Sequence, residues 1–171
     1  LTLSTSAFSG GRETESNNTI LLADTVSSGT QTLGQLSSSS DIDYYSIAVG
    51  SSSTITLDFV APSGLVSSRD YFTVSIVDGN GNVLSQKEGQ SSTVSAAVSS
   101  AGTYYAKVAD EYYYDGGEYG LTLTTAAGNR NTETESNDTI ATANSARDGS
   151  EMKGQLSSSS DIDYYSIAVG S

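Results

Sequence analysis

The stretch Asp43-Tyr-Tyr-Ser-Ile-Ala-Val-Gly-Ser-Ser-Ser-Thr-Ile-Thr-Leu-Asp-Phe59 alternates apolar and polar residues on both sides of a Gly-Ser turn. Such alternation predicts two half-buried β-strands, because successive side chains of a strand point to opposite faces. Similar short runs occur at 72–76, 93–98, 104–108 and 119–123, with turn residues between them. The chain is therefore expected to be built from short strands.

The segments between these runs fit the same picture. Asp78-Gly-Asn-Gly-Asn82 predicts a hairpin turn. It also imitates the start of an EF-hand loop, but Val83 and Gly89 stand where that loop needs glycine and glutamate. Apolar recurrence at helical spacing is weak and confined to residues 20–26. About seven or eight strands with polar turns predict an all-β fold, an antiparallel β-sandwich of jelly-roll or Greek-key type.

The chain also contains an internal repeat. Residues 1–51 and 121–171 are identical at 32 of 51 positions, at an offset of 120 without insertion or deletion. A period of about 120 residues has the size of an independent domain. We therefore expect three parts in tandem: the closing strand of a preceding repeat at 1–8, a complete repeat at 9–127, and the N-terminal part of the following repeat at 128–171.

Composition narrows the functional classes. Cysteine and histidine are absent, which removes disulfides, thiol nucleophiles and imidazole bases, so we expect no enzyme activity. Twenty acidic against seven basic residues give a net charge of −13, which disfavours nucleic acid and favours divalent cations as partners. The apolar runs are only a few residues long, so no membrane span is expected.

Carboxylates gather in two motifs. The first is Glu13-Thr-Glu15-Ser-Asn17-Asn18, and the second, Asp41-Ile-Asp43, follows about 25 residues later. Alternate residues of an extended segment point the same way, so the two glutamates can converge, with Asp41 at the mouth of a strand opposite them. Crowded carboxylates repel each other unless a cation lies between them, and oxygen ligands alone favour Ca²⁺. A solvated acidic loop, or a simple turn at Asp-Ile-Asp, is the alternative.

With several separated motifs in order, the chain resembles the bacterial pre-peptidase C-terminal (PPC) domain, which is related to the collagen-binding domains of clostridial collagenases. The motifs are the acidic opening with Thr-Ile and alanines at 13–23, Gly-x-Leu before Asp-x-Asp-Tyr-Tyr-Ser at 34–46, Gly-Thr-Tyr-Tyr at 102–105, and Tyr-x-Leu-x-Leu at 119–123. The resemblance covers residues 13–124. It implies a jelly-roll sandwich that binds calcium where the N-terminal linker meets the sheet.

The resemblance also implies the calcium ligands, six side chains in each copy, with the Tyr44 backbone as a further candidate. These side chains are Glu13, Glu15, Asn17, Asn18, Asp41, Asp43, Glu133, Glu135, Asn137, Asp138, Asp161 and Asp163. Whether Asp41 or Asp43 touches the ion stays open at this level. Because Asn18 stands where the second copy has Asp138, we expect the first site to bind calcium more weakly.

Two functional hypotheses follow. In the first, the chain is a calcium-binding repeat of a secreted or surface-displayed bacterial protein, an adhesin or fibre-forming stalk, and calcium rigidifies the joints between domains. In the second, it is a module of a secreted peptidase that binds collagen or polysaccharide through Tyr112–Tyr114 or a sheet face. The alternative for Tyr112–Tyr114 is an ordinary loop packed on the sandwich edge.

The partial repeats suggest the partners. The strand expected around Tyr165, Ile167 and Val169 needs a partner sheet that residues 128–171 do not supply. We therefore expect either neighbouring repeats of a longer chain or strand complementation between identical chains. Both functional hypotheses place the protein outside the cell, secreted or at the cell surface.

Overall fold

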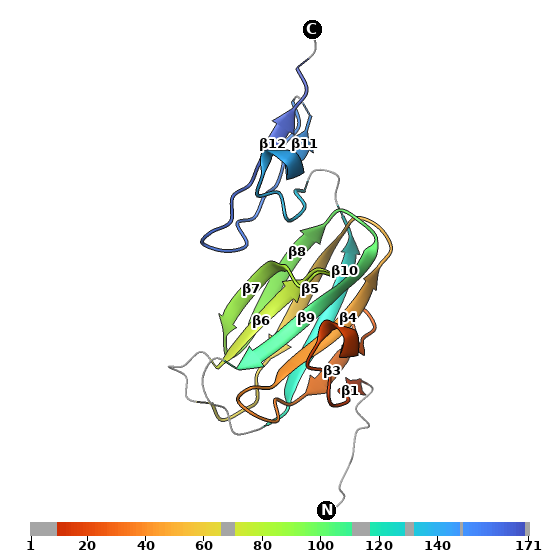
Figure 1. The fold of residues 1–171 in the computed structure, drawn as a ribbon, viewed down its shortest axis with the longest axis vertical. Helices are drawn as coiled ribbons and strands as arrows, with labels where there is room; N and C mark the ends of the chain where they lie inside the picture. The colour runs from red at the N-terminus through yellow and green to blue at the C-terminus, as the bar shows by residue number, and fades with distance from the viewer. Residues whose placement is uncertain (1–9, 66–70, 111–116, 129–131, 148, 170–171) are drawn as a thin grey trace, which may run out of the picture.

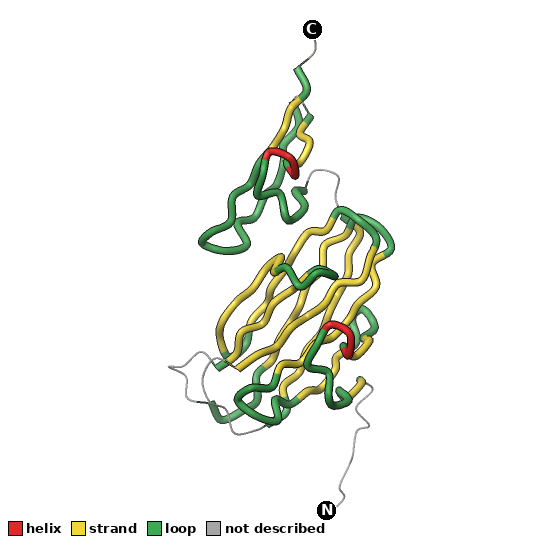
Figure 2. Tube along the Cα trace, viewed as in Figure 1, coloured by secondary structure: helices red, strands yellow, loops and turns green. Residues whose placement is uncertain are grey.

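The computed structural model describes residues 10–65, 71–110, 117–128, 132–147 and 149–169. Strands within residues 10–128 build two facing sheets, and we call this unit the sandwich body (Figure 1). Residues 132–169 form a smaller unit, the C-terminal segment. Helical structure in the described residues is confined to two single turns of 3-10 helix, η1 (Ile20–Leu22) and η2 (Ile140–Thr142) (Figure 2).

The first sheet of the sandwich body has five strands. In spatial order they are β1 (Gly11–Arg12), β3 (Gln31–Gly34), β10 (Tyr119–Ala127), β5 (Ser53–Val60) and β8 (Ser92–Val98). The second sheet also has five strands. Its order is β2 (Asp24–Thr25), β4 (Ile42–Val49), β9 (Gly102–Asp110), β6 (Phe72–Val77) and β7 (Val83–Gly89).

Strands β3 to β10 have the connectivity of an eight-stranded jelly roll. One sheet runs β3-β10-β5-β8 and the other runs β4-β9-β6-β7, so the chain crosses repeatedly between the sheets. The predicted jelly-roll sandwich is confirmed. The expectation of purely antiparallel sheets is wrong in one respect, since β1 pairs in parallel with β3 and β2 in parallel with β4. These strands have two residues each, too few for an alternating pattern to reveal them.

The hydrophobic core lies between the two sheets and consists of the alternate residues that the sequence pattern singles out. On β4, Tyr45, Ile47 and Val49 are buried, and β5, β6, β8, β9 and β10 contribute similar rows. Aromatic rings fill one region, where the ring of Phe59 lies 5.0 Å from that of Phe72, centroid to centroid. Burial of these rows is the main force holding the sheets together.

The hairpin between β6 and β7 forms as the turn sequence predicts. The Asp78 carboxylate accepts hydrogen bonds from the backbone N–H of Asn80 at 2.8 Å and of Asn82 at 2.9 Å. The side chain thereby closes the turn on its own backbone. The prediction of a hairpin turn in place of an EF-hand loop is confirmed.

The C-terminal segment repeats the local structure of the beginning of the sandwich body. Its strands, β11 (Asn144–Ala146) and β12 (Tyr165–Ile167), pair in parallel as β2 and β4 do. The backbone N–H of Tyr164 donates to the carbonyl of Asn137 at 3.1 Å, and the same bond joins Tyr44 to Asn17. The described part of the chain therefore shows these contacts twice.

Some expectations fall outside the described residues. These are the closing strand at 1–8 and the tyrosines Tyr112–Tyr114. The tandem organisation and its boundaries stay predictions. No helix in the described ranges is long and apolar enough to cross a membrane.

Candidate metal centre

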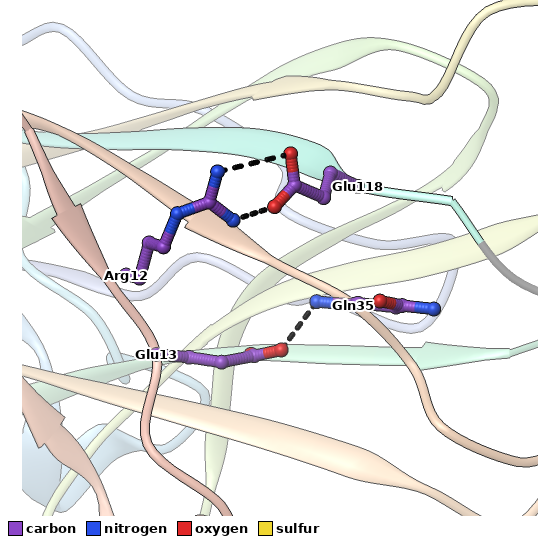
Figure 3. A network of polar contacts seen from close by, with 4 residues as sticks. All are labelled: Arg12, Glu13, Gln35 and Glu118. Carbon is purple, nitrogen blue, oxygen red and sulfur yellow. Dashed lines mark hydrogen bonds and ion pairs between the residues drawn. The ribbon is translucent and has the colours of Figure 1, made fainter. Parts of the chain in front are cut away.

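The position of Glu13 is fixed by the short strand that precedes it. Its backbone N–H donates to the carbonyl of Leu33 at 3.0 Å, and its carboxylate accepts from the N–H of Gln35 (Figure 3). The preceding residue, Arg12, forms an ion pair with Glu118, just ahead of β10, and its guanidinium faces both carboxylate oxygens. The start of the sandwich body is thus held against both β3 and the approach to β10.

Two buried tyrosines connect Glu13 to Asp43. Tyr45 donates a hydrogen bond to Glu13 Oε2 at 2.6 Å, and Tyr119 donates to Asp43 Oδ2. The two hydroxyl oxygens lie 2.7 Å apart. Burial raises the pKa of both tyrosines far above the ordinary value, so both remain protonated donors. Side chains from the segment after β1, from β4 and from β10 therefore form one polar network at the end of the core.

Three carboxylates converge beside this network. Oxygens of Glu13, Glu15 and Asp43 all lie within 4.8 Å of one another. Asp43 and the neighbouring Asn17 have no exposed surface. Within the described residues, Asp43 Oδ1 and Asn17 Oδ1 are buried oxygens without a hydrogen-bond donor. Such oxygens are rare in folded proteins, and a cation is one partner that satisfies them.

The other two side chains of the first set lie at the margin. Asp41 accepts from the backbone N–H of Ser37 at 2.5 Å and of Ile42 at 3.0 Å, so it closes the turn before β4. Asn18 is exposed. The structure therefore brings Glu13, Glu15 and Asp43 together next to Asn17, with Asp41 in the adjoining turn.

The crowding of carboxylates shows in their pKa values. Burial, and then the charges of Glu13, Asp41 and Glu15, raise the pKa of Asp43 from 3.8 to about 8, although the hydrogen bond from Tyr119 opposes the shift. Burial raises the pKa of Glu15 as well, with Asp41 and Glu13 adding to the effect. Ionising this cluster is therefore costly unless a cation offsets the repulsion.

The C-terminal segment contains the same cluster at its equivalent positions. Oxygens of Glu133, Glu135 and Asp163 lie within 4.8 Å of one another, and Tyr165 donates to Glu133 as Tyr45 does to Glu13. Burial raises the pKa of Glu135 to about 7 and that of Asp163 to about 6. Buried oxygens of Glu135, Asn137 and Asp163 have no donor in the described ranges.

A second carboxylate group exists only in this copy. Oxygens of Glu135, Asp138 and Asp161 lie within 4.8 Å of one another. In the sandwich body the residue at the position of Asp138 is Asn18, so the third carboxylate is missing there. Among the six predicted ligands the two copies differ only at this position, but the neighbouring Asp24, which accepts from Asn17 Nδ2, is replaced by Asn144 in the C-terminal segment.

The residues that hold the carboxylate cluster on its core side could not be recognised from the sequence pattern. The sequence pattern predicts Tyr45 and Tyr119 only as core residues and Gly34 only as part of a motif. A Cβ at Gly34 would overlap the hydroxyl oxygens of both tyrosines, so glycine is required for their close approach. One clue was available: Asp43 and Tyr45 share one face of a strand, and a buried tyrosine hydroxyl needs a polar partner.

Comparison with known proteins gave matches among solved structures only, since neither a protein-family profile nor a curated protein matches the chain. The pre-peptidase C-terminal domain of a Bacillus anthracis collagenase is 21% identical, with a TM-score of 0.45, over 60% of this chain and 94% of that domain. PliG, a periplasmic inhibitor of g-type lysozyme from Aeromonas hydrophila, is 13% identical, with a TM-score of 0.44, over 61% of this chain and 96% of that one. The first of these is a domain of the kind that the sequence motifs resemble.

Proposed function

We propose that the chain is a calcium-binding, non-catalytic β-sandwich of a secreted or surface-displayed bacterial protein, an adhesin or a fibre-forming stalk. The observation that supports a cation is the buried oxygen Asp43 Oδ1, which lacks a donor in the described structure and belongs to the carboxylate group of Glu13, Glu15 and Asp43. Asn17 Oδ1, two residues after Glu15, is likewise buried without a donor. The C-terminal segment has the same arrangement at the equivalent positions.

The ligands that we assign in the sandwich body are Glu13, Glu15, Asn17 and Asp43. They offer only oxygen atoms, and each carboxylate oxygen has lone pairs left after its hydrogen bond. Calcium takes about 6–8 oxygen ligands in flexible geometry, so water completes the shell, whereas magnesium needs a tighter octahedron. Of the two aspartates, Asp43 is assigned to the ion because Asp41 is engaged in its own turn.

Calcium in the C-terminal segment would stiffen the joint to the sandwich body. The backbone N–H of Glu135 donates to the carbonyl of Ala97 at 3.1 Å, on β8 at the edge of the first sheet. A groove lined by Ala96 and Ala97 on one side, and by Glu133 and Gln155 on the other, runs along this contact. Glu135, which makes this bond, is the counterpart of the assigned ligand Glu15. Calcium binding at Glu135 would therefore restrain the angle between the two units.

Calorimetry on the whole chain tests the metal site. We expect heat of calcium uptake, a higher melting temperature with calcium, and reversal of both by chelation. Asp43→Asn should lower calcium affinity by at least ~10-fold, equivalent to about 1.4 kcal/mol. The matched control is Asp58→Asn, because Asp58 is exposed on β5, where it accepts from the Thr93 hydroxyl. Equal affinities of the two variants would contradict the assignment.

Small-angle scattering tests the joint. With calcium, the two units should hold one relative orientation, and the distribution of distances in the chain should narrow compared with the chelated sample. Glu135→Gln should broaden that distribution and leave uptake at Glu13, Glu15 and Asp43 unchanged. A maximum dimension that does not respond to calcium would exclude the role in rigidifying the joint.

A further inference from the structure

Identical sequences have opposite burial in the two halves of this chain. The last 18 residues repeat residues 34–51 letter for letter. Ile47 is 3% exposed, whereas its counterpart Ile167 is 55% exposed. Val49 is 5% exposed, whereas Val169 is 87% exposed. The sequence is the same, so the difference comes entirely from what covers these side chains.

In the sandwich body, β4 lies between β2 and β9 in the second sheet. Strands β4 and β9 are antiparallel, with Ala106 opposite Tyr45 and Tyr104 opposite Ile47. In the C-terminal segment, β12 pairs with β11 and with no other strand of the described residues. The edge of β12 that corresponds to the β9 side of β4 is therefore open, next to an exposed apolar face.

We propose that this open edge of β12 accepts a strand of the β9 type, running antiparallel to it and followed by a strand that covers the apolar face as β10 does. The register is set by the copy in the sandwich body. A small residue should lie opposite Tyr165 and an aromatic residue opposite Ile167. Because β12 has the same sequence as the matching part of β4, the strand that pairs with it should resemble the strand that pairs with β4. Residues 102–127, which contain β9 and β10, therefore define the chemistry of the partner.

The sandwich body of a second copy is a poorer occupant. Its β9 is already paired on both sides, with β4 and with β6, so it could reach β12 only if that body opened. If β9 left the body of a second copy to pair with β12, the β4 of that copy would lose its own partner, so nothing would be gained. The partner is therefore a polypeptide segment with the pattern of residues 102–127 that is free to pair. This proposal does not depend on calcium binding.

A labelled peptide with the sequence of residues 102–127, added to the intact chain, tests the proposal. We expect saturable binding, and changes in the NMR amide signals at 163–169 without changes at the identical residues 43–49. A peptide of the same composition in scrambled order should not bind. Failure of the native-order peptide to bind up to its solubility limit would overturn the proposal.

Two variants locate the binding. Ile167→Asp should reduce peptide affinity at least ~10-fold, because it places a charge on the face to be covered. Val60→Asp is the matched control: Val60 is also 55% exposed, lies on β5, and should leave binding unchanged. The amide signal of Tyr164, which bonds to Asn137, reports whether the variant segment keeps its fold.

Two results would count against the proposal even if the peptide binds. Binding that Ile167→Asp leaves unchanged would place the peptide elsewhere on the chain. Light scattering that shows a dimer, abolished by Ile167→Asp, would identify the C-terminal segment of a second copy as the occupant. A monomer that binds the peptide at 163–169 supports the proposal.

Discussion

Tyr119 of β10 donates a hydrogen bond to Asp43 of β4, a residue 76 positions earlier in the chain. The bond joins the two sheets at the carboxylate cluster, because β10 belongs to the first sheet and β4 to the second. Neither residue has more than a trace of exposed surface. Under the proposed assignment, metal ligation and closure of the sandwich would therefore be coupled through one hydroxyl group.

Tyr119→Phe should weaken both stability and calcium binding. The change leaves a buried carboxylate oxygen without its donor, which typically costs about 1–3 kcal/mol of unfolding free energy. Denaturant unfolding and calorimetry would measure the two effects. Tyr104→Phe is the control, because the Tyr104 hydroxyl bonds to the exposed Ser100, away from the carboxylate cluster, so both quantities should change little. Equal behaviour of the two variants would argue against the coupling.

Stability without calcium should fall as pH rises. The pKa of Asp43 is raised from 3.8 to about 8, so the folded chain holds this proton more tightly than the unfolded chain. Its contribution to stability is fully present below about pH 4 and is lost as pH rises through about 8. In chelator, the melting temperature should drop between pH 5 and pH 9, and calcium should stabilise most at the alkaline end. Asp43→Asn should flatten the chelator profile; an unchanged slope would refute the attribution to Asp43.

Gly34→Ala should destabilise the sandwich body by about 1–3 kcal/mol, the usual range for forcing extra atoms into a packed interior. The new methyl group would overlap the hydroxyls of Tyr45 and Tyr119. Gly50→Ala is the matched control, since no atom lies within 4 Å of a Cβ built there. Thermal or chemical unfolding compares the two. Similar losses in both variants would show that the tyrosine pair tolerates the methyl group.

Asn18→Asp should strengthen calcium binding by the sandwich body, by about 10-fold or 1.4 kcal/mol. It supplies the carboxylate that the C-terminal segment has at Asp138, close to Glu135 and Asp161. The reverse change, Asp138→Asn, should weaken binding by a similar factor. Calorimetry on both variants measures the pair. The prediction fails if the two substitutions shift affinity in the same direction.

Replacing the same isoleucine in the two copies should have unequal costs. Ile47→Ala removes a side chain from the core and should lower the unfolding free energy by about 2–5 kcal/mol. Ile167→Ala alters an exposed position and should stay within about 0.5 kcal/mol. Because the residues around Ile47 and Ile167 are identical in sequence, each variant is the control for the other. Equal costs would mean that Ile167 is covered in solution.

Much of the fold could be predicted from the sequence because the strands follow a local rule. Alternation marks β4, β5 and β9 directly, and the turn residues between them separate the strands. The order of strands in each sheet could not be predicted, since it depends on contacts between distant segments. The two-residue strands β1 and β2 have no pattern of their own and form only where neighbouring strands hold them.

The candidate site was predictable in part for a similar reason. Glu13, Glu15 and Asn17 lie close in sequence, and their spacing alone suggests convergence. The choice of Asp43 over Asp41 depends on the direction in which each side chain leaves the backbone at the start of β4. Tyr119 could not be assigned to the site, because no local feature connects it to a carboxylate 76 positions away.

The jelly-roll order also determines when the site can be completed during synthesis. Within the body, its acidic ligands are synthesised early, whereas the hydroxyl that secures Asp43 comes from β10, the last strand of the body. While β5 to β9 are being synthesised, the nascent body thus carries its acidic side chains without the group that orders them. Tight calcium binding would therefore begin only after β10 has joined the body.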